Sequence, residues 1–203
     1  MHTIVQQKTI GEAIVAHMLD TKIFDNPKIP WCIDLDGTLI TEDVTVRAFW
    51  GLVRQPSPLK LMRGLLCFFR GHAQAKQYVE QSYKVDVRTL TYNKGLLNLI
   101  KRHRAQGGLT VLATAADKSV AERISQYLGL FDAVVASDGT TNRRAQAKAI
   151  ALNERLGKGR YLYAGNSKDD LQVWPSACAA LVVNASTLVA KKALQLGIPC
   201  RIL

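Results

Sequence analysis

Short apolar runs of the β type alternate with helix-like segments along most of the chain, and this rhythm limits the possible folds more than any other feature. Five runs predict buried strands at 31–35, 109–115, 131–137, 160–166 and 179–185. The segments between them predict helices at 93–106, 118–128, 145–156, 170–178 and 187–196. Continuous apolar strands joined by helices are typical of a parallel sheet covered on both faces. We therefore expect an α/β fold with a Rossmann-like, doubly wound parallel sheet, to which the final PCRIL adds an edge strand.

One interval interrupts this rhythm. Between Leu39 and Tyr92 the sequence is helix-like and holds no convincing strand, and it is too long for a simple β–α connection. Before the first strand, apolar residues recur at the spacing of an amphipathic helix. We therefore divide the chain into an N-terminal helix packed on the core (1–27), a core domain (28–40 and 93–203) and a helical cap inserted after the first core strand (41–92).

The charge balance indicates which partners suit the chain. The formal net charge of +11 favours anionic surfaces: nucleic acid, acidic lipid or phosphorylated substrates. The sequence contains no helix-turn-helix, zinc finger or aromatic RNA-binding pattern, so we expect no nucleic-acid partner. It also contains neither a membrane-spanning apolar run nor a secretory signal. We expect a cytoplasmic protein, with peripheral contact at the inner face of an anionic membrane left open.

Two aspartates, Asp34 and Asp36, stand at the end of the first predicted strand, in DLDGT. Residues two apart in a strand point to the same side, and ligands of parallel sheets bind at the carboxyl ends of strands. Adjacent carboxylates repel each other unless a cation or a shared proton offsets the repulsion. The pattern indicates a hard cation such as Mg²⁺, with one carboxylate as nucleophile and the other as acid/base. The alternative is an ordinary turn, because Asp and Gly are common turn residues.

Other strand ends carry polar residues that suit a phosphoryl group. Thr114 ends the second strand and offers a hydroxyl, and Lys148 follows the third strand and can neutralise phosphate charge. The loop after the fourth strand offers oxygen ligands from Asn166, Asp169 and Asp170. Singly, these residues are more often a β-branched strand residue, a solvated lysine and helix-capping acids. Their order along the chain, at successive strand ends, favours one shared site.

On these four motifs the chain resembles the haloacid dehalogenase superfamily of aspartyl-phosphate phosphatases. The matching sequences are DLDGT, Thr114 in LATAAD, Lys148 in RRAQAKAIAL, and GNSKDD. The resemblance covers nearly the whole chain beyond Lys28 and implies a phosphomonoesterase that works through an aspartyl phosphate.

The resemblance also implies a role for each motif residue. Asp34 would attack the phosphorus, and Asp36 would protonate the leaving oxygen and then activate water. Thr114 and Lys148 would hold the transferring phosphoryl group. The expected Mg²⁺ ligands are the carboxylate of Asp34, the backbone carbonyl of Asp36, and the loop residues Asn166 and Asp170. Further candidates for substrate contact are Thr38, Ala115, Asn142 and Asp169.

The chain departs from the pattern at one metal ligand. Many members have Asp where this chain has Asn166, and an amide oxygen can ligate Mg²⁺ without adding negative charge. This departure favours a second hypothesis: a catalytically weak relative that binds a phosphorylated ligand and regulates a partner. A receiver domain also uses Asp, Thr and Lys around Mg²⁺, but the insertion and the nucleophile's place after the first core strand disfavour it.

A narrower resemblance concerns the sequence from LTYNKG to ASDG and the sequence YAGNSKDDLQVW. They are similar to the phosphatase-like domain fused ahead of polyprenyltransferases of the 4-hydroxybenzoate type. That family usually shows Asn-Leu-x-Gly before its lysine; here Asn142 is kept, Arg143 replaces the leucine and Ala145 replaces the glycine.

The expected substrate is a phosphorylated small molecule or a lipid-linked, polyprenyl-type phosphate. The cap carries the basic, apolar stretch RQPSPLKLMRGLLCFFRGHAQAK. A helix of that kind can lie at a membrane interface or line a pocket for a lipid tail, and the alternative is an ordinary cap helix packed on the core. The sequence predicts no oligomeric state.

Overall fold

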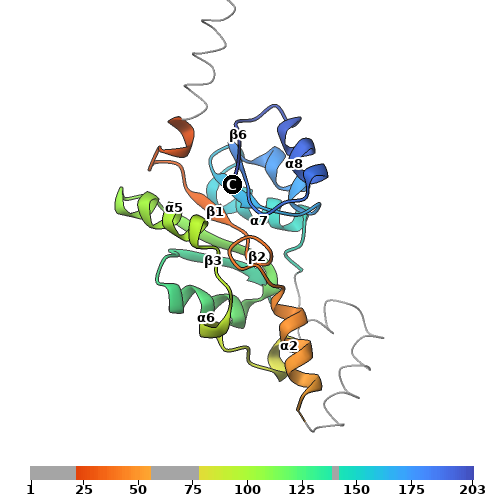
Figure 1. Ribbon diagram of the computed structural model, residues 1–203. Coiled ribbons are helices and arrows are strands. Elements are labelled where there is room, and N and C mark those ends of the chain that lie inside the picture. Colours follow the sequence, from red (N-terminus) through yellow and green to blue (C-terminus); the bar gives the residue numbers. More distant parts are fainter. Residues whose placement is uncertain (1–21, 56–77, 139–141) are drawn as a thin grey trace, which may run out of the picture.

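The computed structural model describes residues 22–55, 78–138 and 142–203 (Figure 1). In these ranges the chain forms one sheet of six strands in the order β3-β2-β1-β4-β5-β6, and every neighbouring pair is parallel. The strands are β1 (Trp31–Ile33), β2 (Thr110–Asp117), β3 (Ala133–Ser137), β4 (Leu162–Gly165), β5 (Ala179–Val182) and β6 (Cys200–Ile202). The expected parallel α/β fold is confirmed, including the final edge strand.

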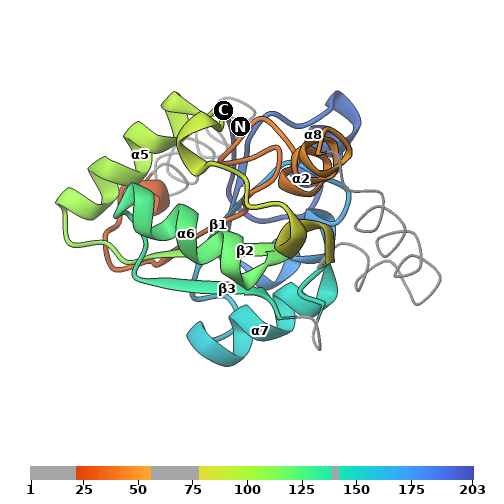
Figure 2. The ribbon, with the colours of Figure 1, turned by 90° about the horizontal axis from the view of Figure 1, so that it is seen from below.

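Helices cover both faces of the sheet. They are α2 (Val44–Val53), α5 (Lys94–Ala105), α6 (Lys118–Leu128), α7 (Gln146–Leu156) and α8 (Thr187–Leu194), with 3₁₀ turns η1 (Val87–Thr89), η2 (Asp170–Gln172) and η3 (Trp174–Ser176). Figure 2 shows α6 and α7 on opposite sides of β3. Residues of α5 and α6 belong to one buried apolar cluster, and residues of α7 and α8 belong to the other.

The strands contribute alternate side chains to these two clusters. In β1, Ile33 lies in the cluster of α5 and α6, whereas Cys32 lies in the cluster of α7 and α8. In β5, Leu181 and Ala180 divide in the same way. Because both faces of β1, β4 and β5 are buried, an uninterrupted apolar run is needed there, and this explains why these strands were evident in the sequence.

The expected helix at 170–178 is wrong. The chain instead forms the two short 3₁₀ turns η2 and η3, with Pro175 at the start of η3. Proline has no backbone N–H to donate, and its ring collides with the preceding turn of a continuing α-helix. The loop is therefore compact but irregular, and it folds back towards the end of β4.

Both ends of the expected cap insertion meet at one point. Ile40 and Tyr92 form an isolated antiparallel bridge, and the backbone N–H of Thr41 donates to the carbonyl of Thr91 at 3.0 Å. Buried Glu80 then joins the returning chain to the core, because the backbone N–H of Asp117 donates to its Oε2 at 2.6 Å. The division into cap and core remains a prediction.

Two expected segments lie outside the described residues. These are most of the N-terminal helix, up to residue 21, and the basic apolar part of the cap between residues 56 and 77. Over the remaining residues, each helix is too short or too polar to cross a bilayer.

Candidate active site

The nucleophile candidate lies in a buried loop directly after β1. The backbone N–H of Asp34 donates to the carbonyl of Ala164 in β4 at 3.0 Å, which fixes the loop to the neighbouring strand. One carboxylate oxygen of Asp34, Oδ1, accepts a hydrogen bond from Lys148 Nζ at 2.5 Å. The other, Oδ2, accepts from the hydroxyl of Thr38 at 3.2 Å. Thr38 and Lys148, from two distant parts of the sequence, therefore meet at the Asp34 carboxylate.

The turn after Asp34 brings this loop against the loop after β4. Gly37 has a φ of +74°, a backbone conformation that favours glycine. A Cβ atom at this position would lie 2.0 Å from Nδ2 of Asn166. The amide of Asn166 therefore packs directly on the DLDGT turn, where the sequence predicts a metal ligand.

Asp36 lies at the start of the cap insertion. Its Oδ1 accepts a hydrogen bond from the backbone N–H of Val44, the first residue of α2, at 2.8 Å. Its side chain is thus oriented by the helix that leads away from the site. Asp36 therefore lies between the loop that carries Asp34 and the start of α2.

Lys148 lies in the first turn of α7, shortly after a residue with an unusual backbone conformation. Ala145, the residue before the helix, has φ +50° and ψ −119°, and no side chain caps the helix there. Residues other than glycine rarely adopt this conformation. The lysine lies almost completely buried in the first turn of α7. Lys148 is therefore a buried lysine paired with a carboxylate, and not the solvent-exposed lysine that the sequence left as the alternative.

Asp170 holds the loop after β4 in shape. Its Oδ2 accepts hydrogen bonds from the backbone N–H groups of Asn166 and Ser167 at 2.9 Å and 2.8 Å, and from the Ser167 hydroxyl at 2.9 Å. Its Oδ1 accepts from the Tyr163 hydroxyl at 2.7 Å. Gly165 is needed for this packing, because a Cβ there would lie 2.6 Å from the Asp170 carboxyl carbon. Asp170 is 2% exposed, so its oxygens point into the loop.

Tyr163 is a site residue that our sequence reasoning missed. It lies in β4, is fully buried, and accepts a hydrogen bond from Lys148 Nζ at 2.8 Å. The signal in the sequence was a phenol two residues before Gly165, on a strand that is otherwise aliphatic at its centre. The position of Tyr163 in the sequence did not show that its hydroxyl would contact Lys148 and Asp170.

Burial controls the electrostatics of this cluster. It raises the pKa of the Asp34 carboxyl to about 7; Lys148 opposes the shift, whereas Asp170 and Asp36 add to it. Burial by itself lowers the pKa of Lys148, but the carboxylates of Asp34 and Asp170 outweigh it and hold that pKa above its ordinary value. Burial also raises the pKa of Tyr163 well above its ordinary range, so its hydroxyl keeps its proton. One lysine therefore faces three carboxylates, an excess of negative charge that favours a cation.

The residues present fit the Mg²⁺ ion that the fold family implies. Oxygen ligands are available from the Asp34 carboxylate, the Asp36 backbone carbonyl and the Asn166 side-chain amide, whose loop packs on the DLDGT turn. Hard oxygen donors with excess negative charge are what Mg²⁺ prefers in proteins. Among the described residues, no group of three His, Cys, Asp or Glu side chains could hold a metal, so such a site would depend on the carbonyl and amide oxygens.

Within the described part of the chain, the other expected site residues form no hydrogen bond with Asp34. Thr114 is fully buried in β2, and its Oγ1 accepts from the backbone N–H of Ala116 at 2.9 Å, which leaves its own proton available to donate. The Ala115 carbonyl accepts from the Ser137 hydroxyl at 3.0 Å. Asp169 is ion-paired with Arg144 at 2.6 Å, and Asn142 is exposed.

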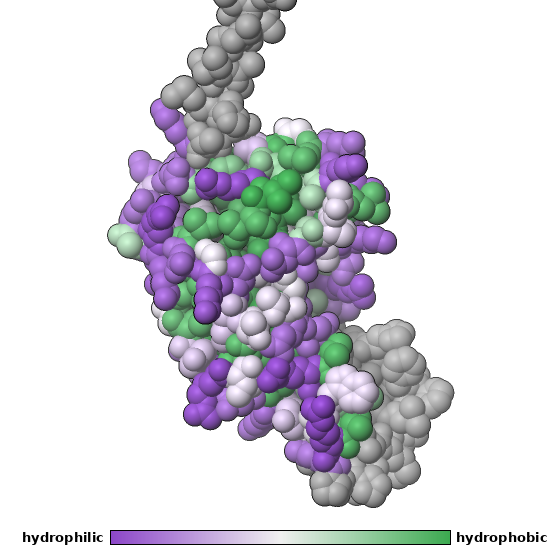
Figure 3. All heavy atoms as spheres, viewed as in Figure 1, coloured by the Kyte–Doolittle hydropathy of each residue, from purple (hydrophilic) through white to green (hydrophobic). Residues whose placement is uncertain are grey.

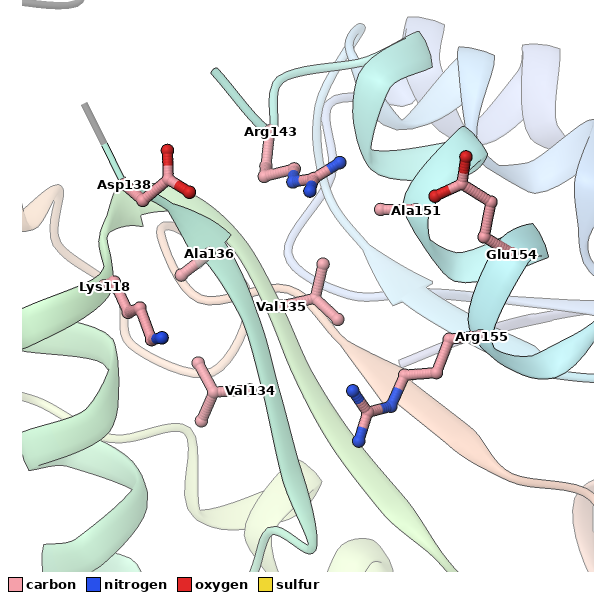
Figure 4. Close-up of a pocket in the computed structure, with 9 residues that line it drawn as sticks. All are labelled: Lys118, Val134, Val135, Ala136, Asp138, Arg143, Ala151, Glu154 and Arg155. Atoms are coloured by element: carbon pink, nitrogen blue, oxygen red, sulfur yellow. The ribbon is translucent and has the colours of Figure 1, made fainter. Parts of the chain in front are cut away.

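A separate hollow of about 360 Å³ lies along the outer strand β3 (Figure 4). Its lining combines apolar strand residues with side chains of both charges: Lys118, Val134, Val135, Ala136, Asp138, Arg143, Ala151, Glu154 and Arg155. None of the expected catalytic or metal-binding residues lines it. It is therefore not the site built around Asp34.

Comparison with known proteins agrees with this arrangement. The sequence model of the haloacid dehalogenase-like hydrolases matches residues 32–174, which include every expected catalytic residue. The uncharacterized protein y4nM of Sinorhizobium fredii (strain NBRC 101917 / NGR234) is 34% identical over 186 residues, covering 92% of this chain and 36% of that protein. This chain thus spans about a third of that relative's length.

Solved structures share the fold at low sequence identity. A protein of unknown function from Bordetella pertussis Tohama I superposes with a TM-score of 0.66 at 18% identity, covering 86% of this chain and 98% of that one. A substrate-bound phosphoserine phosphatase gives 0.59 at 15% identity, covering 86% and 93%. A predicted phosphatase from Clostridium acetobutylicum gives 0.59 at 17% identity, covering 87% and 94%.

Proposed function

Because this chain belongs to the haloacid dehalogenase-like hydrolases, we propose that it is a Mg²⁺-dependent phosphatase that hydrolyses a phosphomonoester through a phosphorylated Asp34. The observation that carries the proposal is the buried contact between Lys148 Nζ and Asp34 Oδ1 at 2.5 Å. It places a fixed cation beside a carboxylate at the carboxyl end of a parallel strand, where a phosphoryl group could bind.

Each step of the proposed reaction uses a named residue. An oxygen of Asp34 attacks the phosphorus while Asp36 gives a proton to the leaving oxygen, and Asp36 then takes a proton from the water that hydrolyses the phosphoaspartate. Lys148 and the Thr114 hydroxyl hold the phosphoryl oxygens. Bound at Asp34, the Asp36 carbonyl and Asn166, Mg²⁺ would neutralise charge on the phosphoryl group. Asp170 would position Asn166, because it accepts a hydrogen bond from the backbone N–H of Asn166 and so orders the loop that carries this residue.

An apolar surface next to the site supports a substrate with an apolar chain. Helix α2 starts at Val44, which contacts Asp36, and its outward residues Val46, Phe49, Trp50 and Val53 follow the spacing of one helix face. Trp50 is 53% exposed, and a few apolar side chains are visible among polar ones at the lower end of the molecule (Figure 3). We propose that the tail of a lipid-type phosphate lies along α2 while its phosphate lies at Asp34.

The reaction is tested by hydrolysis of p-nitrophenyl phosphate with and without Mg²⁺. Wild type should turn over only with the metal, and Asp34→Asn should be inactive because an amide is a far poorer nucleophile. Asp25→Asn, a similar change at an exposed carboxylate, should behave as wild type. Equal steady-state activity in Asp34→Asn would exclude Asp34 as the nucleophile. Absence of turnover in wild type with short- and long-chain phosphates would favour the binding and regulatory alternative.

The tail site is tested by comparing kcat/KM for a long-chain and a short-chain alkyl phosphate. Trp50→Ser should reduce the preference for the long chain, whereas Leu188→Ser, an exposed apolar residue of α8, should leave it unchanged. Equal preference in both variants would contradict a tail site on α2.

A further inference from the structure

The hydroxyl of Tyr163 lies between the two oppositely charged groups of the site. It accepts a hydrogen bond from Lys148 Nζ at 2.8 Å and donates to Asp170 Oδ1 at 2.7 Å. Without it, Lys148 and Asp170 would face each other directly, because Nζ is already 3.8 Å from Asp170 Oδ1. The phenol thus connects the lysine that contacts the nucleophile to the aspartate that shapes the loop after β4.

The Tyr163 ring is held firmly in this place. The indole N–H of Trp174 donates to its backbone carbonyl at 3.1 Å, and the two rings meet edge to face with centroids 6.5 Å apart. On another side, Lys148 Nζ lies 5.5 Å from the centroid of the Tyr163 ring. A fully buried ring fixed on several sides cannot turn its hydroxyl away without repacking its surroundings.

The Tyr163 hydroxyl occupies one of the hydrogen-bond donors of Lys148. An ammonium group has three N–H donors. One donates to Asp34 and one to Tyr163. The third makes no hydrogen bond to a described residue, although Nζ is also ion-paired with Asp170 Oδ1 at the longer distance of 3.8 Å. The third donor is therefore the one available to an oxygen of a bound phosphoryl group.

Removing the hydroxyl would change this balance. Lys148 would lose one of its two acceptors, and Asp170 Oδ1 would lose its donor. In a buried site the attraction between an ammonium and a carboxylate is strong, because water does not screen it. The lysine would move the short remaining distance to Asp170 and weaken its contact with Asp34.

We propose that Tyr163 is a positioning residue that keeps the ion pair of Lys148 and Asp170 from closing to a direct hydrogen bond, so that the lysine stays on Asp34 with one donor directed at the substrate. This inference rests on the proposed phosphatase reaction for its kinetic consequence. Its structural part, the separation of the two charges, does not depend on turnover.

The test compares Tyr163→Phe with Tyr161→Phe. Tyr161 is a matched control because it lies two residues earlier, is also fully buried and donates its hydroxyl hydrogen bond to Asn153 at 3.1 Å, away from the site. Crystal structures of both variants and steady-state kinetics with p-nitrophenyl phosphate would be measured at saturating Mg²⁺, together with melting temperatures.

In Tyr163→Phe we expect the distance from Lys148 Nζ to Asp170 Oδ1 to shorten from 3.8 Å to hydrogen-bonding range, about 3 Å. We expect kcat to fall about 10- to 100-fold, as for other small misplacements of a catalytic group, and KM to change less than about threefold. Tyr161→Phe should lose similar thermal stability but keep both the distance and kcat.

Two results would overturn the inference. One is a Tyr163→Phe structure in which Lys148 stays in its wild-type place, whatever the activity. The other is a kcat for Tyr163→Phe within about twofold of Tyr161→Phe. If wild type and Asp34→Asn are equally inactive, the proposed reaction fails, and the distance in the Tyr163→Phe crystal still decides whether Tyr163 separates the two charges.

Discussion

Replacing Ala145 by glycine should stabilise the protein, although glycine is normally a destabilising substitution. Ala145 has φ +50° and ψ −119° immediately before α7, a conformation open to glycine but strained for alanine. Such strain costs about 1–3 kcal/mol for one residue. The backbone hydrogen bonds from Lys148 and Ala149 to the Ala145 carbonyl would be unchanged, since they involve no side-chain atom.

The opposing term comes from the unfolded chain. Glycine has more unfolded conformations to lose, which costs about 0.4–1 kcal/mol. The Ala145 side chain is only half-buried, so its methyl group adds little packing. The balance is a gain of about 1 kcal/mol in the free energy of unfolding, which for a chain of 203 residues corresponds to a melting temperature higher by about 2–4 °C.

Urea denaturation of wild type, Ala145→Gly and Ala190→Gly measures this difference. Ala190 lies inside α8, where the same change should cost about 1 kcal/mol because helical backbone suits alanine. The two substitutions should therefore shift the denaturation midpoint in opposite directions. A loss of stability in Ala145→Gly similar to that in Ala190→Gly would refute the strain at Ala145.

Three other perturbations give defined results. Asn166→Asp should bind Mg²⁺ several-fold more tightly by calorimetry, because it adds a negative charge among the proposed ligands, and an unchanged affinity would argue against Asn166 as a ligand. Gly37→Ala and Gly129→Ala both place alanine at positive φ and should each lose about 1 kcal/mol, but only Gly37→Ala should also lose turnover, since its Cβ would lie 2.0 Å from the Asn166 amide and Gly129 has open space. Burial lowers the pKa of His103, so its contribution to stability is complete above about pH 6.5 and is lost as the pH falls through the lowered folded value. Unfolding free energy measured from about pH 7 to pH 5 should fall less steeply in His103→Phe, which keeps a ring against Trp31, and parallel curves would contradict this assignment.

The sequence predicted the central strands of the sheet well because β1, β4 and β5 are buried on both faces. Strands of this kind are apolar throughout, and such runs are visible without knowing their partners. The helix at 118–128 was predicted to the residue, and its limits are local: Asp117 caps its start and Gly129 ends it with positive φ. The helix expected at 170–178 failed because Pro175 begins a separate 3₁₀ turn and because Asp170 shapes the loop through four hydrogen bonds that carry no periodic signal.

The site was predictable only in part for a similar reason. Asp34, Thr38 and Lys148 were expected on motif and order, and the structure brings them together. The role of Tyr163 depends on a contact between β4 and α7, which no local pattern encodes. The pairing of Asp169 with Arg144 is equally non-local, and it separates two adjacent aspartates that the sequence could not distinguish.

The bridge between Ile40 and Tyr92 brings together the two ends of the segment that we expect to form the cap. The chain leaves and returns at nearly the same point, and no strand pair of the sheet involves a described residue between these two positions, so the strand registers do not fix the length of this segment. The length of the segment can therefore change without altering the sheet. A graft that keeps the buried residues Val44, Ala48 and Glu80 and exchanges the rest of the segment would show whether this part of the chain selects the substrate of the proposed reaction.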